Sequence, residues 1–127
     1  MSEKKKIRVG LADDEMHIRM LMKKFFISMN CDIAGEAKNG REAVELYRRE
    51  KPDIMLLDIN MPVMPGDEAL KAIIKEFPDA FVIMLTSLAD MENVQTCLEA
   101  GAANYIRKDT PLSELKEIIK ETWKIMK

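Results

Sequence analysis

The sequence contains few of the residues that mark metal-binding and disulfide-bonded proteins. Its 127 residues include only two cysteines and one histidine. Cys31 and Cys97 are far apart in the chain and form no metal-ligand spacing, so we expect two free buried thiols in a reducing cytoplasm. His17 falls in a segment of helical periodicity, where a surface position is expected rather than a catalytic one. A disulfide scaffold and a cysteine- or histidine-based metal site are therefore not predicted.

Long apolar runs and an excess of charge of one sign are also missing. No run approaches the ~18 apolar residues of a membrane helix, and Met1–Lys6 lacks the apolar segment of a secretion signal. We therefore expect a cytoplasmic protein with no membrane partner. The net charge is −2 with both signs interspersed, unlike the basic face of a nucleic-acid-binding protein, so no direct contact with nucleic acid is expected.

The composition that is present suits one folded domain over residues 1–127, with residues 1–6 as a flexible flank. Hydrophobic residues make up 47% of the chain and charged residues 33%, which is enough for a core and argues against disorder. Short apolar runs alternate with longer segments of helical periodicity. Strands are predicted at 7–11, 31–37, 54–57, 80–85 and 104–107, and helices at 16–29, 40–50, 67–76, 90–100 and 111–126.

Local signals mark the ends of three of these helices. Asn39 and Glu42 have the spacing of a capping box, with asparagine in place of the usual serine or threonine. Gly101 is expected to end the fourth helix. Thr110 is predicted as the N-cap of the last helix and Pro111 as its first residue.

A strand followed by a helix, repeated five times, predicts the fold class. The strands at 54–57 and 80–85 are apolar at every position, so helices must cover both faces of the sheet. Right-handed crossovers then give an α/β protein with a doubly wound, five-stranded parallel sheet of the flavodoxin-like (βα)5 kind. In such sheets the functional site lies beyond the carboxyl ends of the strands.

Polar and charged side chains follow four of the five predicted strands. Asp13 and Asp14 follow the first strand, Asp58 the third, Thr86 the fourth and Lys108 the fifth. Taken singly, each has an ordinary structural interpretation, such as a helix N-cap for Asp13 or Asp14. Together, three carboxylates at one edge repel one another unless a hard divalent cation such as Mg²⁺ joins them. Asp58 is then the candidate nucleophile for phosphoryl transfer, assisted by Lys108 and Thr86.

In this order and spacing the residues resemble the receiver domains of two-component response regulators, including the chemotaxis regulators, over nearly the whole chain. The segments that carry the resemblance are Leu11–Glu15, Pro52–Pro62, Gly66, Met84–Ser87, Gly101–Ala102 and Tyr105–Lys108. The resemblance implies a phosphoacceptor switch rather than an enzyme. Asp58 would accept a phosphoryl group from a sensor histidine kinase, or from a small donor such as acetyl phosphate.

The resemblance also implies Mg²⁺ as the cofactor and assigns its ligands. Asp14, Asp58 and the backbone carbonyl of Asn60 would bind the ion directly, and Asp13 would act mainly through a water molecule. Lys108 would contact the phosphoryl oxygens. These roles all fall on residues at the predicted strand ends.

A conformational switch is implied in the same way. Thr86 would move toward the phosphoryl group on activation, and Tyr105 would swing inward to fill the space that Thr86 leaves. The surface that responds would be residues 90–126, which would bind a downstream protein target; a dimer through this surface is left open. The resemblance also implies that Asn60 and Leu88 flank the approach of the attacking water. Because Leu88 cannot orient that water, we expect a longer phosphorylated lifetime than in fast chemotaxis regulators.

The chain departs from the usual family pattern after Lys108, where many receivers have proline, often after a cis peptide bond. Here Asp109 follows, and without proline a cis bond would cost ~2.5–4 kcal/mol, so the sequence leaves cis and trans open. Lys-Asp at this position is similar to receivers joined to helix-turn-helix output domains. The helical ending at residues 123–127 favours a stand-alone protein, but a receiver of a larger regulator stays open, as do the kinase, the target and the pathway.

Two other classes are compatible with parts of the pattern. Haloacid-dehalogenase phosphatases also use a strand-end aspartate with Mg²⁺, but they need a second aspartate two residues on, where Asn60 stands. A nucleotide-binding flavodoxin-like module needs a phosphate loop after the first strand, where Asp13 and Asp14 would repel phosphate. Both fit the sequence less well than the receiver hypothesis.

Overall fold

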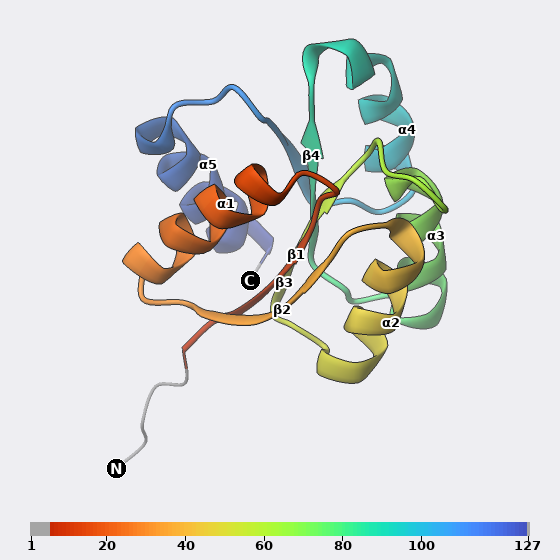
Figure 1. Cartoon of the computed structure of the whole chain (residues 1–127), viewed down its shortest axis with the longest axis horizontal. Helices are drawn as coiled ribbons and strands as arrows, with labels where there is room; N and C mark the ends of the chain where they lie inside the picture. Colours follow the sequence, from red (N-terminus) through yellow and green to blue (C-terminus); the bar gives the residue numbers. More distant parts are fainter. Residues whose placement is uncertain (1–5, 127) are drawn as a thin grey trace.

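The structure, a computed structural model, describes residues 6–126; positions 1–5 of the predicted flexible flank, and residue 127, lie outside this range. Five strands form one parallel sheet in the order β2-β1-β3-β4-β5, which confirms the predicted fold class (Figure 1). The strands are β1 (Arg8–Ala12), β2 (Asp32–Ala37), β3 (Ile54–Asp58), β4 (Val82–Thr86) and β5 (Asn104–Arg107). The helices are α1 (Met16–Ser28), α2 (Gly40–Glu50), α3 (Gly66–Glu76), the 3₁₀ helix η1 (Leu88–Asn93), α4 (Val94–Glu99) and α5 (Leu112–Met126).

Two hydrophobic clusters lie on opposite faces of the sheet. Helices α2, α3 and α4 cover one face and α1 and α5 the other, so the sheet is the middle layer of three (Figure 1). Alternate residues of β3 join the two clusters: Met55 and Leu57 point to the first, Ile54 and Leu56 to the second. The prediction that fully apolar strands need helices on both faces is confirmed.

Two predicted helix starts are close to the observed ones but differ in detail. Asn39 caps α2, and its side chain accepts a hydrogen bond of 2.8 Å from the Glu42 N–H. The Glu42 carboxylate reaches back to the Lys38 N–H at 2.9 Å, one residue earlier than in a standard capping box. In α5 the Leu115 N–H bonds the Pro111 carbonyl at 3.0 Å. Pro111 is therefore the N-cap, and the prediction of Thr110 for that position is wrong by one residue.

The segment predicted as one helix over residues 90–100 is divided. It begins as the 3₁₀ helix η1 and becomes α-helical only at Val94. The Asp90 N–H bonds the Ser87 carbonyl at 3.1 Å, while the Ser87 hydroxyl bonds Asp90 Oδ2 at 2.9 Å. This pair of contacts between residues three apart favours the tighter 3₁₀ turn. Gly101, with φ of +115°, follows the end of α4 as predicted.

Three further predictions can be compared with the structure. Cys31 and Cys97 are buried free thiols. His17 is exposed and lies beside Glu15. None of the helices within residues 6–126 is long and apolar enough to cross a membrane.

Candidate functional site

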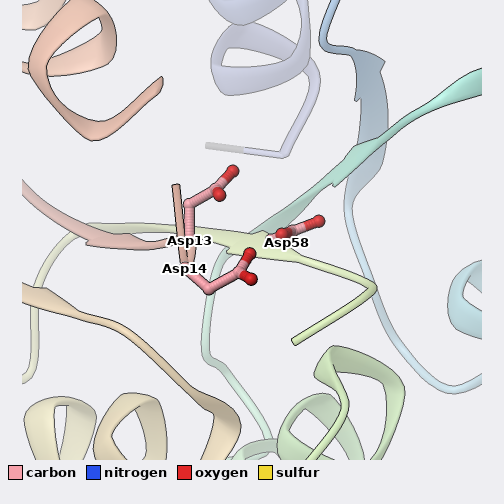
Figure 2. Close-up of side chains that lie close together, drawn as sticks. All are labelled: Asp13, Asp14 and Asp58. Atoms are coloured by element: carbon pink, nitrogen blue, oxygen red, sulfur yellow. The ribbon is translucent and has the colours of Figure 1, made fainter. Parts of the chain in front are cut away.

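The carboxyl ends of β1 and β3 lie side by side where the strand order reverses, and three aspartates gather there. Asp13 and Asp14 follow β1, and Asp58 is the last residue of β3 (Figure 2). One carboxylate oxygen from each lies within 4.8 Å of the others. Asp13 and Asp58 are both 1% exposed, whereas Asp14 is exposed. The tertiary structure therefore brings Asp58 beside Asp13 and Asp14, which precede it by more than forty positions in the sequence.

The loop after β3 holds Asp58 in place through backbone contacts. The Asn60 N–H lies 3.3 Å from Asp58 Oδ1, and the Gly66 N–H bonds the Ile59 carbonyl at 2.7 Å. A Cβ atom at Gly66 would collide with the Asp58 carbonyl oxygen, so only glycine permits this close approach of α3 to the end of β3. The Asn60 N–H thus orients the Asp58 carboxylate, and the contact with α3 fixes the backbone at the end of β3.

Lys108 is the cation that faces the aspartates. Its Nζ lies 3.0 Å from Asp13 Oδ2 and 3.1 Å from Asp58 Oδ2, and it donates a hydrogen bond of 3.0 Å to Glu15 Oε1. Its backbone N–H bonds the Thr86 carbonyl at 2.8 Å, which extends the β4–β5 pairing to the site. The described residues contain no cis peptide bond, so the Lys108–Asp109 bond, open from the sequence, is trans.

Burial and charge shift the protonation of these groups. Burial, and then the charge of Asp13, raise the pKa of Asp58 to about 7, although Lys108 acts in the opposite direction. Burial lowers the pKa of Lys108, but its contacts with Asp13, Glu15 and Asp58 outweigh that effect and raise it. The ammonium therefore stays charged, while Asp58 is only partly ionised at neutral pH. The single positive charge of Lys108 therefore does not fully balance the negative charges of the neighbouring carboxylates.

The donor set fits a hard divalent cation. Asp13 Oδ2 and Asp58 Oδ2 are buried oxygens that accept no hydrogen bond from any residue within 6–126, and each forms an ion pair with Lys108. Carboxylate and carbonyl oxygens with room for water are what Mg²⁺ takes in proteins. A cleft lined by Asp14, Asn60 and Lys108, among others, opens beside the three acids and gives such an ion a path of entry.

Of the remaining predicted residues, only Asn60 is among those that line this cleft. Thr86 is fully buried, and its hydroxyl donates to the Ser87 carbonyl at 3.0 Å. Tyr105 is half-buried and packs against the hydrophobic cluster beneath α4. Asn60 is exposed and lines the cleft. Leu88, 72% exposed at the start of η1, is not among the residues that line it.

Three side chains near the site were not predicted to act there. Glu15 bonds Lys108, and Asp90 lines the same cleft. Arg19 is buried under the β1–α1 turn, where its Nη1 donates to the Asp13 carbonyl at 2.7 Å. A signal for Arg19 was present in the sequence, since it lies three residues before Met22 and seven before Phe26 on the inward face of the first helix.

The sequence matches a known protein family and is similar to several known proteins. Residues 9–120 match the family described as the response regulator receiver domain. The chain is 38% identical to the chemotaxis protein CheY of Thermotoga maritima over 117 residues, 92% of this chain and 98% of that protein. It is 40% identical over 110 residues to the uncharacterized transcriptional regulatory protein YhcZ of Bacillus subtilis, covering 86% of this chain but 51% of that protein.

A solved structure gives the same result for the fold. The structure titled as the CheX-CheY-BeF3-Mg+2 complex from Borrelia burgdorferi matches with a TM-score of 0.87 at 29% identity. The match covers 92% of this chain and 89% of that one. The chain therefore spans about half the length of YhcZ and nearly the whole length of the Thermotoga maritima protein.

Proposed function

The chain belongs to the response regulator receiver domain family of two-component systems, and on this basis we propose that Mg²⁺-dependent transfer of a phosphoryl group to Asp58 switches its α4-β5-α5 surface. Members of the family are phosphoacceptor switches that interact with histidine kinases and downstream effectors. The observation that carries the proposal is the grouping of Asp13, Asp14 and Asp58 at one strand edge, opposite Lys108. Family membership also sets aside the phosphatase and nucleotide-binding alternatives.

Asp58 is the proposed nucleophile. Its carboxylate oxygen would bond to phosphorus while the bond from phosphorus to the imidazole nitrogen of a sensor kinase's phosphohistidine breaks, and the leaving imidazole takes up a proton. With acetyl phosphate the leaving group is acetate. The reaction needs Asp58 in its ionised form, which burial and then the neighbouring Asp13 disfavour in the absence of a further cation.

Mg²⁺, held by Asp14, Asp58 and the Asn60 carbonyl, with Asp13 through water, would supply the charge that keeps the carboxylates ionised and balances the phosphoryl oxygens. Lys108 would exchange its contact with Asp58 for a phosphoryl oxygen. Its ammonium already lies 3.1 Å from Asp58 Oδ2, so only a small displacement is required.

The switch would start at Thr86. Its hydroxyl now donates to the Ser87 carbonyl, and it would turn to a phosphoryl oxygen instead. Tyr105, half-buried on β5 beside β4, would move into the space that is left. The change would spread to α4, β5 and α5, which we propose as the surface for a downstream protein target, with no direct contact to nucleic acid.

The lifetime of the phosphorylated state is proposed to depend on Asn60 and Leu88. Asn60 lines the cleft, and Leu88 has an exposed apolar side chain that offers no hydrogen bond to an attacking water. Slow hydrolysis is therefore expected.

The proposal is tested with acetyl phosphate and Mg²⁺, followed by intact-protein mass spectrometry. The wild type should gain one phosphoryl group, and chelation of Mg²⁺ or Asp58→Asn should prevent it. Asp79→Asn is the matched control, because Asp79 is exposed in the turn between α3 and β4, at the other end of the sheet. Labelling of Asp58→Asn to the wild-type extent, or none of the wild type with any phosphodonor, would contradict the proposal.

A further inference from the structure

Arg19 is a charged side chain buried beside the acid cluster. Only 9% of its side chain is exposed, although it lies on a short surface helix. Its Nη1 donates to the Asp13 carbonyl at 2.7 Å, and its Nε donates to Glu36 Oε1 at 3.1 Å. Burying a guanidinium group is costly and seldom increases net stability over an apolar side chain of similar volume. Its placement therefore calls for an explanation other than stability.

We propose that Arg19 is a positioning residue for the Mg²⁺ site, acting through the peptide bond between Asp13 and Asp14. This inference rests on the proposed function and goes beyond it, because Arg19 is neither a ligand of the ion nor a contact of the phosphoryl group in that proposal. Its role is to hold the main chain from which Asp14 extends into the cleft.

The first step of the argument is the geometry of that peptide. A peptide unit is planar, so a bond that fixes the Asp13 carbonyl also fixes the Asp14 N–H and the direction in which the Asp14 chain continues. The Asp13 N–H donates to the Ala37 carbonyl at 3.0 Å, and Asp13 Oδ1 accepts from the Glu15 N–H at 2.9 Å. Arg19 supplies the remaining anchor at the carbonyl.

The second step concerns Asp14 itself. Within residues 6–126, no hydrogen bond or ion pair holds the Asp14 carboxylate, and the residue is exposed. Asp13 and Asp58 each have Lys108 as a partner. The position of the Asp14 carboxylate thus depends on its backbone, which Arg19 helps to hold at the Asp13 carbonyl.

The third step is that Arg19 is held in turn from the edge strand β2. Glu36 pairs with Arg19 and also with Lys23, whose Nζ lies 2.7 Å from Glu36 Oε2. This second cation fixes the carboxylate that orients the guanidinium. A metal site whose ligands are oriented by outer hydrogen bonds typically loses 10- to 100-fold in affinity when such a partner is removed.

Whether replacing Arg19 strengthens or weakens Mg²⁺ binding distinguishes a positioning role from a simple effect of charge. Arg19 is a cation close to a cation-binding site, so electrostatics alone predicts that its removal would tighten Mg²⁺ binding. Loss of positioning predicts weaker binding. The two explanations therefore give opposite results in one measurement.

The experiment is isothermal titration calorimetry of the whole protein with Mg²⁺ alone, comparing the wild type with Arg19→Met and Arg8→Met. Arg8 is the matched control, because it makes the same two kinds of contact at the other end of β1: its Nη1 donates to the Glu50 carbonyl at 2.6 Å and its Nη2 to Glu50 Oε1 at 2.7 Å. Arg19→Met should raise the Kd for Mg²⁺ roughly tenfold, and Arg8→Met should leave it unchanged. Urea unfolding of each variant separates this effect from a loss of stability.

Two further variants keep the test decisive if Arg19→Met folds poorly. Arg19→Lys keeps the charge but lacks the planar fork that bonds the Asp13 carbonyl and Glu36 at the same time, so it should restore only part of the affinity. Glu36→Gln changes a side chain that is 33% exposed and should weaken Mg²⁺ binding by less than Arg19→Met. Tighter binding by Arg19→Met, or a Kd equal to that of Arg8→Met, overturns the inference alone. A wild type that binds no Mg²⁺ overturns the proposed function as well.

Discussion

Lys108 Nζ lies 3.1 Å from Asp58 Oδ2, and the two side chains come from strands that are not neighbours in the sheet. β4 separates β3 from β5, so Lys108 reaches across the end of β4, above Thr86. The ion pair therefore spans the carboxyl end of β4, at the edge of the sheet. It brings a positive charge to the oxygen on which a phosphoryl group is expected.

Replacing Lys108 tests the value of that charge. Lys108→Met should slow phosphorylation by acetyl phosphate roughly 100-fold, as expected when one charged donor to a developing negative charge is lost. The rate is followed by mass spectrometry at saturating Mg²⁺. Lys75→Met, at an exposed position of α3, is the control and should react like the wild type. Equal rates for the two variants would mean that Lys108 has no part in the reaction.

The raised pKa of Asp58 predicts how stability changes with pH. Its pKa is about 7 in the folded protein, against 3.8 for an unperturbed aspartate, so the folded state holds the proton more tightly than the unfolded state. The resulting stabilisation is complete below about pH 4 and is lost as the pH rises through about 7. Metal-free wild type should thus lose stability, relative to Asp58→Asn, between about pH 5 and pH 8.

Urea unfolding in the presence of a chelator at both pH values measures this difference. Asp58→Asn lacks the titrating group and should show a weaker dependence on pH. Added Mg²⁺ should remove the destabilisation of the wild type at the higher pH, because the ion compensates the same carboxylates. Parallel pH curves for the wild type and Asp58→Asn would contradict the assignment.

Thr86→Ala should separate phosphorylation from the switch. The side chain is fully buried and its hydroxyl bonds only a backbone carbonyl, so the variant should fold and still accept a phosphoryl group. What should be lost is the response of α4-β5-α5, measured as amide chemical-shift changes on addition of beryllium fluoride and Mg²⁺. Thr96→Ala, exposed on α4, is expected to respond fully. A full response from Thr86→Ala would exclude it as the start of the switch.

Leu88→Gln should shorten the phosphorylated lifetime. Since Leu88 is 72% exposed, the change leaves the core intact. An amide near the cleft could orient the attacking water, with a gain well below the ~100-fold typical of full general acid–base catalysis. Leu88→Met keeps the apolar character and is the control. If phosphate release from the two variants has the same rate, position 88 does not affect hydrolysis.

Gly66→Ala should weaken both the fold and the site. The added methyl group would collide with the Asp58 carbonyl, and overpacking of this kind costs about 1–3 kcal/mol. Phosphorylation should slow because the end of β3 is displaced. Gly10→Ala is a useful comparison, as its methyl group would meet the flexible Met55 side chain, with Sδ 2.8 Å away. It should cost less stability and leave phosphorylation unchanged.

The strands, most helix boundaries and the grouping of the acids at the carboxyl ends of the strands could all be predicted from the sequence. Fully apolar strands such as Ile54–Leu57 are buried on both faces, and a polar residue that follows them must lie at the sheet edge. Because all strands are parallel, their carboxyl ends share one edge, and the strand order then brings Asp13, Asp58 and Lys108 together there. The hydrophobic periodicity of each segment and the order of strands and helices along the chain are enough to predict this shared edge.

Other features depended on contacts between distant parts of the chain. The hydrogen bonds from Lys108 to Glu15 and from Arg19 to Glu36 are examples. Each depends on how a side chain or main-chain group is oriented after packing, and local propensity does not determine that orientation. The amino-acid order thus decided which residues meet at the rim. Only the tertiary structure decided their pairing, because buried charges and backbone groups take the partners that the packed elements bring within hydrogen-bonding distance.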